Sequence, residues 1–211
     1  MKTIGDIHIA GSLTTDDWNK LRATLNPGGD PAIWGKAFED YFHTRLSLRY
    51  LGPIKVLQDN GTLRGEGFSI VAIQCSLVEF LESTVQGKSY RFCPKGAPLL
   101  GPYEYSSSSD IFVSFLLNRT PFKNDFKDND IARDFYVGVR CGLLHEARTK
   151  NGWTILARES GGHTIDASQK IVYRDNVQES LLSFVEWYKG ALTSDNSLQE
   201  AFLRKFDSLC V

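Results

Sequence analysis

Residues 129–147 read NDIARDFYVGVRCGLLHEA, and this stretch has the pattern of a helix. An apolar side chain recurs every four positions, which predicts one buried helical face formed by Ile131, Phe135, Val139 and Leu143. Asn129 or Asp130 can cap the first turn, because their side-chain oxygens accept hydrogen bonds from free backbone N–H groups. The same helix holds Arg140 and His145, so one predicted element carries both a cation and an imidazole.

Arg140 and His145 have chemistry suited to a phosphodiester. A guanidinium keeps its charge and presents a planar set of donors to phosphate oxygens, whereas an imidazole gains and loses a proton near neutral pH. On a regular helix, side chains at this spacing differ by about 140° around the axis, so the two do not share a face. Gly142 would ease a local distortion, and a two-fold homodimer would bring both copies into one composite cleft. We expect the dimer.

Composition and charge exclude several classes of protein. The chain of 211 residues has a net charge of −1, which argues against coating of nucleic acid through a global basic field. The four cysteines form no C-x-x-C pair, so the sequence predicts neither a structural zinc site nor a disulfide scaffold, and we expect no metal and no cofactor. No signal peptide and no long apolar run is evident. The sequence therefore predicts a cytoplasmic protein that does not enter a membrane.

The N-terminal part of the chain contains two predicted helices. Residues 1–30 form a peripheral N-terminal segment with a capped helix start at residues 14–17. Pro31 opens a longer helix that runs to about Leu51. The pair Gly52–Pro53 is expected to interrupt that helix, because proline lacks the N–H that an inner helical turn requires.

The middle of the chain holds the most hydrophobic helix-length stretch, residues 66–85. Its apolar residues fall on all sides, which predicts a central buried helix with Gly87 at its C-terminal cap. Residues 88–109 are rich in Pro, Gly and Ser and predict a surface loop. A short helix is expected at 110–117.

The spacing of apolar residues changes after the predicted helix at residues 129–147. Residues 153–173 alternate like strands, and Gly161–Gly162 supplies a turn, so we expect one small β-hairpin. Helices follow at 176–189 and at about 197–209. The fold class is therefore mainly α, with one helical domain over residues 31–211.

The local text resembles HEPN domains, a family of helical bundles defined by an R-x(4–6)-H motif near a dimer interface. The resemblance spans roughly residues 31–192 and is carried by residues 135–147, 153–155, 49–54, 65–68 and 74–77. It implies a HEPN-like helical bundle, with the β-hairpin (about 153–173) inserted between the motif helix and the C-terminal helices.

Many HEPN proteins are metal-independent ribonucleases of defence and toxin systems. The resemblance implies an endoribonuclease that cleaves RNA by attack of the 2′-hydroxyl on phosphorus, with His145 moving protons and Arg140 holding the phosphate. RNA, a second copy of the chain, and an antitoxin or another defence-system protein are the expected partners. Catalytic members often have Asn or Asp where this chain has Cys141, which is a weaker hydrogen-bond donor. Ala147 stands where adenylylated toxins carry tyrosine, so that mode of control is not implied.

Other charged residues extend the candidate site. Arg133, Arg148 and Lys150 can form a strip that contacts RNA, although neighbouring carboxylates also fit a solvated face. The possible supporting residues are Cys141, Glu66, Arg45 and Glu79. Buried charges need partners, so we expect Arg45 to pair with Glu79, and Glu66 can cap a helix start.

Two other functions fit the same residues. A non-catalytic HEPN module would bind RNA or a protein partner, with Cys141 marking lost chemistry. A helical structural subunit would keep Arg140 and His145 internally paired. An open cleft lined by both residues would favour the enzyme.

Overall fold

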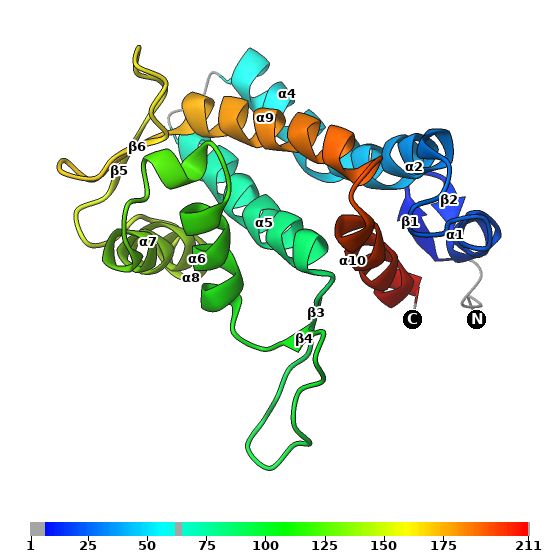
Figure 1. Ribbon diagram of the computed structural model, residues 1–211. Coiled ribbons are helices and arrows are strands. Elements are labelled where there is room, and N and C mark those ends of the chain that lie inside the picture. The colour runs from blue at the N-terminus through cyan, green and yellow to red at the C-terminus, as the bar shows by residue number, and fades with distance from the viewer. Residues whose placement is uncertain (1–6, 62–64, 211) are drawn as a thin grey trace. The chain divides into compact units, whose positions relative to one another are not determined.

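The computed structural model describes residues 7–61 and 65–210, and most of them are helical (Figure 1). The mainly α prediction is therefore confirmed. The chain divides into two compact units, which are described separately. The first unit comprises residues 1–52, 83–106 and 187–211, and the second comprises residues 53–82 and 107–186.

The first unit begins with a small hairpin of β1 (His8–Ala10) and β2 (Leu13–Thr14), followed by helix α1 (Thr15–Arg22). Thr14 and Asp17 form a reciprocal capping box at the start of α1, as the sequence predicted. Trp18 has no exposed surface and packs against Phe206 of helix α10 (Asn196–Asp207). The segment predicted to be peripheral thus supplies a core residue to this unit.

A single helical run extends from Pro31 to Asn60. It consists of α2 (Pro31–Ala37), a π-helical segment (Phe38–His43), α3 (Thr44–Leu46), a second π-helical segment (Ser47–Leu51) and α4 (Gly52–Asn60). The predicted interruption at Gly52–Pro53 is wrong. The wide π turn ends where Gly52 donates its N–H to the carbonyl of Ser47, and this turn lets the helix continue past a proline that has no N–H to give.

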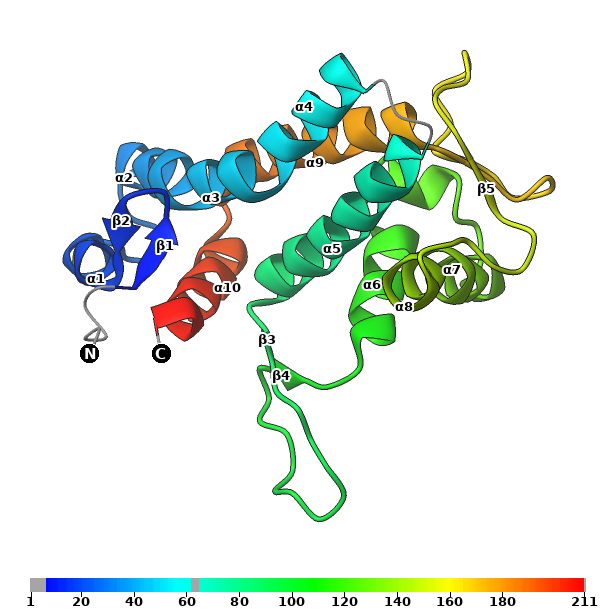
Figure 2. The ribbon, with the colours of Figure 1, turned by 180° about the vertical axis from the view of Figure 1, so that it is seen from behind.

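Helix α5 (Glu66–Gln86) confirms the predicted core helix, and its residues Ile70, Leu77 and Leu81 have no exposed surface. Gly87 follows it with a φ of +63°, a conformation that favours glycine. By length and composition α5 could cross a membrane, but 56% of its apolar window is buried, which is typical of a core helix. Figure 2 shows α5 beside α6 (Ser108–Asn118) in the second unit.

The predicted motif helix runs from α7 (Asn129–Phe135) through a π-helical segment (Tyr136–Cys141) into α8 (Gly142–Glu146). Asp128, rather than Asn129 or Asp130, caps its start by accepting from the N–H of Ile131. The distortion comes before Gly142 and includes Arg140. Gly142 serves a close approach, since a Cβ there would lie 2.5 Å from the Arg148 carbonyl oxygen.

The region predicted as one hairpin is a three-stranded sheet of β5 (Thr154–Leu156), β6 (Ile165–Asp166) and β7 (Ile171–Tyr173), in the order β5-β7-β6. The antiparallel turn joins β6 to β7, where Asp166 accepts hydrogen bonds from the N–H groups of Ser168 and Gln169. β7 then pairs with β5 in parallel. The chain does turn at Ser160–Gly161, but this turn does not close the hairpin, because the local Asp166 turn joins β6 to β7 instead.

The remaining predictions hold at the level of elements. Helix α9 (Arg174–Leu192) and helix α10 lie where two C-terminal helices were expected, and α6 lies where a short helix was expected. The predicted surface loop contains one short parallel pair, β3 (Ser89–Tyr90) with β4 (Glu104–Tyr105).

Candidate functional site

Arg140 lies in the π-helical part of the motif helix and is held from two sides. Its Nη2 donates to Oε2 of Glu79 at 3.2 Å, and each of the two side chains is 17% exposed. Its guanidinium carbon lies 5.3 Å from the centre of the Tyr136 ring, one helical turn earlier. Arg140 therefore has a fixed position close to the surface of the second unit.

Glu79 comes from α5 and completes this cluster. The Ser108 hydroxyl, at the start of α6, donates to its Oε1 at 2.8 Å. Burial alone would lower the pKa of Arg140, but Tyr136, Glu79 and Cys141 outweigh it, so the pKa of Arg140 lies above its ordinary value. Arg140 therefore stays positively charged, and the negative charge of the neighbouring Glu79 carboxylate offsets part of that positive charge.

His145 is exposed at the end of α8. In the part of the chain that the structure describes, its ring makes no hydrogen bond or ion pair and does not contact Arg140. No hydrogen bond joins the two motif residues within the chain, in agreement with their angular separation on a helix. Neither the pocket lined by Val71, Gln74 and Phe112 nor the one lined by Asp125, Glu159 and His163 includes Arg140 or His145.

The predicted RNA-contacting strip is paired with carboxylates. Arg133 lies 3.3 Å from Asp110, and Arg148 lies 3.2 Å from Glu146. Lys150 also pairs with Glu146. These cations are on the surface, but each has an acidic neighbour that lowers the local positive potential.

The possible supporting residues have separate surroundings. Cys141 is half-buried beside Arg140 and contributes to the raised pKa of that guanidinium. Glu66 opens α5 and lies 3.8 Å from Arg174 of α9. Arg45 belongs to the first unit, where it donates to the Ile9 carbonyl at 2.6 Å, and burial lowers its pKa to about 10. Because Glu79 belongs to the second unit, the Arg45–Glu79 pair stays a prediction.

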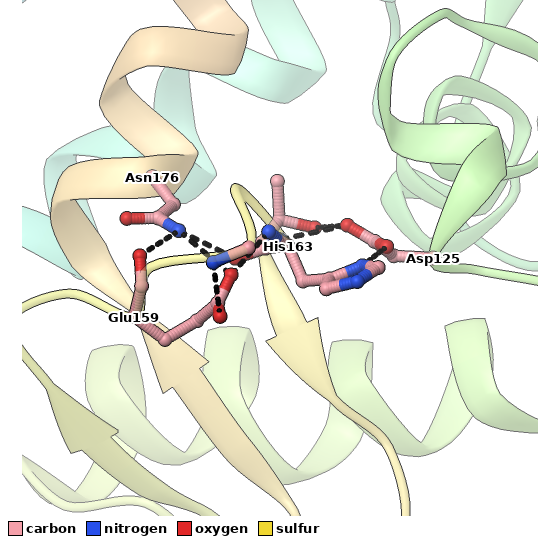
Figure 3. Close-up of polar contacts among 6 residues, drawn as sticks. Asp125, Glu159, His163 and Asn176 are labelled. Carbon is pink, nitrogen blue, oxygen red and sulfur yellow. Dashed lines mark hydrogen bonds and ion pairs between the residues drawn. The ribbon is translucent and has the colours of Figure 1, made fainter.

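The structure also reveals a histidine site that the sequence did not predict (Figure 3). Nδ1 of His163 lies 2.7 Å from Oδ1 of Asp125, and the imidazole is 66% exposed. Because a carboxylate only accepts, Nδ1 must carry the proton and Nε2 is left toward solvent. In the sequence His163 lies between Gly162 and Thr164, and its partner lies 38 positions away, so no local pattern signals the pair.

An open pocket of about 320 Å³ adjoins this histidine. Its lining combines acidic, aromatic and apolar side chains from Asn124, Asp125, Glu159, His163, Ile165, Asp166, Ala167 and Tyr173. Across the described residues, no group of three or more His, Cys, Asp or Glu side chains is arranged to hold a metal ion.

Comparisons with protein-family models, with curated proteins and with solved structures found no match to this chain.

Proposed function

We propose that the protein is a metal-independent endoribonuclease of the HEPN type that acts as a homodimer. One observation carries the proposal: the motif helix presents Arg140 in a position fixed by Glu79 and Tyr136, and it ends in an exposed His145. A fixed guanidinium can hold a phosphate, and a solvated imidazole can move protons near neutral pH.

The proposed reaction cleaves the RNA backbone without water in its first step. An imidazole takes the proton of the 2′-hydroxyl, whose oxygen attacks phosphorus and expels the 5′-oxygen. A protonated group returns a proton to that leaving oxygen, and Arg140 stabilises the charge of the phosphorane. The products are a 2′,3′-cyclic phosphate and a free 5′-hydroxyl.

A dimer supplies what one chain lacks. Val137 and Leu144 lie two turns apart on the motif helix and are 49% and 47% exposed. Covering these apolar side chains with the same helix of a second copy would be favourable. It would also place two copies of Arg140 and His145 around one two-fold axis. The exposed apolar pair therefore supports the composite cleft.

A second function is a non-catalytic module that binds RNA or a protein partner. The ion pair of Arg140 with Glu79 favours it, because a guanidinium that is satisfied inside the chain has fewer donors for a phosphate. Cys141 next to Arg140 fits the same function, since a thiol orients an RNA hydroxyl poorly.

Incubation of the purified chain with total RNA and labelled tRNA in EDTA separates these functions. The enzyme predicts cleavage with 2′,3′-cyclic phosphate ends that is lost in Arg140→Ala and in His145→Ala. Two surface variants, Arg158→Ala and His8→Ala, serve as matched controls and should cleave like the parent. Circular dichroism verifies that every variant is folded.

The oligomeric state is measured in parallel by sedimentation. Val137→Asp with Leu144→Asp should give a folded monomer without activity. Cleavage that survives both motif substitutions contradicts the proposal, as does a parent dimer that binds RNA without cutting it; the latter result identifies the binding module.

A further inference from the structure

The loop between β5 and β6 is attached to its surroundings at two points, both in the second unit. The first point is Asp125, which follows a short 3-10 turn (Phe122–Asn124) and is only 9% exposed. Its Oδ2 accepts from the N–H and the hydroxyl of Thr164, both at 2.7 Å, while its Oδ1 faces His163. Asp125 thus binds two consecutive residues of the loop (Figure 3).

The second point is Asn176, in the first turn of α9. Its Nδ2 donates to the Glu159 carbonyl at 3.1 Å and to the His163 carbonyl at 3.0 Å. The Glu159 carboxylate accepts from the N–H of Gly161 and the N–H of His163, so it closes the loop on itself. This attachment does not involve the His163 imidazole.

The contact between His163 and Asp125 is the part of the loop that responds to protons. Asp125 and Glu159 face the imidazole with negative charge and Lys127 with positive charge, while Asp166 and Tyr173 line the adjoining pocket. The hydrogen bond and charge of Asp125 raise the pKa of His163 above its ordinary value, and Glu159 adds to the effect. Protonation at Nε2 adds a positive charge to the donor of a hydrogen bond whose acceptor is already a carboxylate, and the resulting ion pair is the stronger interaction.

We propose that residues 159–164 form a proton-controlled latch, which protonated His163 holds closed on Asp125 and which loosens when His163 loses its charge. Asn176 keeps the other end attached in both states. Since Asp125, Glu159 and His163 all line the pocket, the state of the latch determines how closely these lining residues are held together. Asp125, on which the latch closes, lies just before the motif helix, which begins at Asn129.

The direction of the effect follows from linkage. A histidine whose pKa is raised by folding stabilises the closed latch fully below its ordinary pKa of about 6.5. That stabilisation is lost as the pH rises through the raised pKa. The latch is therefore closed in mild acid and looser in mild base.

The test combines two measurements on the full chain. Histidine NMR titration should give His163 a pKa above that of a free peptide spanning residues 157–167. Amide hydrogen exchange, corrected for the intrinsic pH dependence, should show protection of residues 159–164 falling about two- to fivefold across the same pH range, the range expected for an exposed ion pair. Peptides from α9 should show no such change.

Variants test whether His163 and Asp125 cause the pH dependence of the loop. His163→Gln keeps a donor and has no titration, so its loop should show low protection that does not change with pH. Asp125→Asn should behave in the same way, and His8→Gln should behave like the parent. A parent loop with protection independent of pH, a His163 that titrates like the free peptide, or a His163→Gln loop that still responds to pH would each overturn the proposal.

Discussion

Glu82 is a fully buried acidic residue in the second unit, and its interactions are strong. Its side chain has no exposed surface and binds Arg119 through two hydrogen bonds, of 2.7 and 3.0 Å. The Ser114 hydroxyl donates to the same carboxylate at 2.7 Å. Removing one charge from such a group leaves its partner poorly satisfied, which is costly in a low-dielectric site.

We expect Glu82→Gln to lower the free energy of unfolding by about 2–4 kcal/mol, measured by urea denaturation. Glu179→Gln is the matched control, because Glu179 also meets an arginine, Arg158, at 2.7 Å but is 59% exposed. The control should change stability by about 0–1 kcal/mol. Equal losses in the two variants would show that burial does not decide the contribution of these pairs.

At the scale of elements, the helical run from Pro31 to Asn60 depends on its second π-helical segment. A Cβ on Gly52 would lie 2.7 Å from the Ser47 carbonyl oxygen, whereas a Cβ on Gly35 in the same run meets nothing within 4 Å. The π turn therefore requires glycine at one position and leaves the other open.

Gly52→Ala should lower the free energy of unfolding by about 1–3 kcal/mol, because the turn must shift to admit the methyl group. Gly35→Ala should raise it by about 0.5–1 kcal/mol, since alanine favours a helix interior. Both values come from urea denaturation followed by circular dichroism. A stabilised Gly52→Ala variant would contradict the role given to the π turn.

Local signals account for the elements that were predicted correctly. The capping pair Thr14 and Asp17 and the apolar row of the motif helix act over three or four residues. The parallel pairing of β5 with β7 joins Thr154 to Ile171, and no local period encodes such a pairing. The prediction at Gly52–Pro53 was wrong because it assumed the hydrogen bonds of an α-helix, and amino-acid composition does not distinguish a π turn from an α turn.

For the candidate site, too, the sequence indicated local features but not pairings between distant residues. Arg140 and His145 are visible as a motif, and the helical period correctly indicated that they diverge. Glu79 was visible as a charge in an apolar helix, but its partner was not, because Arg140 is 61 positions away. The His163–Asp125 pair has no sequence signal, since both residues lie in irregular segments whose approach depends on tertiary structure.

At the scale of the whole molecule, stability should depend on carboxylates in both units. Backbone and side-chain hydrogen bonds from Thr14 lower the pKa of Asp17, and a backbone hydrogen bond from Gly101, with Arg91, lowers that of Glu104. In the second unit burial would raise the pKa of Asp134, but hydrogen bonds from Lys170, Asn151 and Trp153 lower it overall. These groups favour the folded state only when ionised.

The sign of the pH dependence follows. A carboxylate whose pKa is lowered by folding contributes stability above its unfolded pKa of about 4, and that stability is lost as the pH falls through the folded value. We therefore expect the urea midpoint to be similar at pH 7 and pH 5.5 and to fall progressively below about pH 4. His163 acts in the opposite sense, because its contribution is lost as the pH rises through its raised pKa, so it is not the cause of the fall in acid.

The variant Asp134→Asn tests whether an ionised carboxylate causes this loss of stability in acid. The variant keeps one carbonyl oxygen, so it can accept from Trp153 or from Asn151 but not from both, and it loses the charge that pairs with Lys170 at 2.9 Å. It should be less stable than the parent at pH 7, and the difference should narrow as the pH falls through the lowered pKa of Asp134, where the parent loses the same charge. A difference that stays constant from pH 7 to pH 3 would mean that Asp134 contributes through packing and hydrogen bonds, with no stabilisation from its charge.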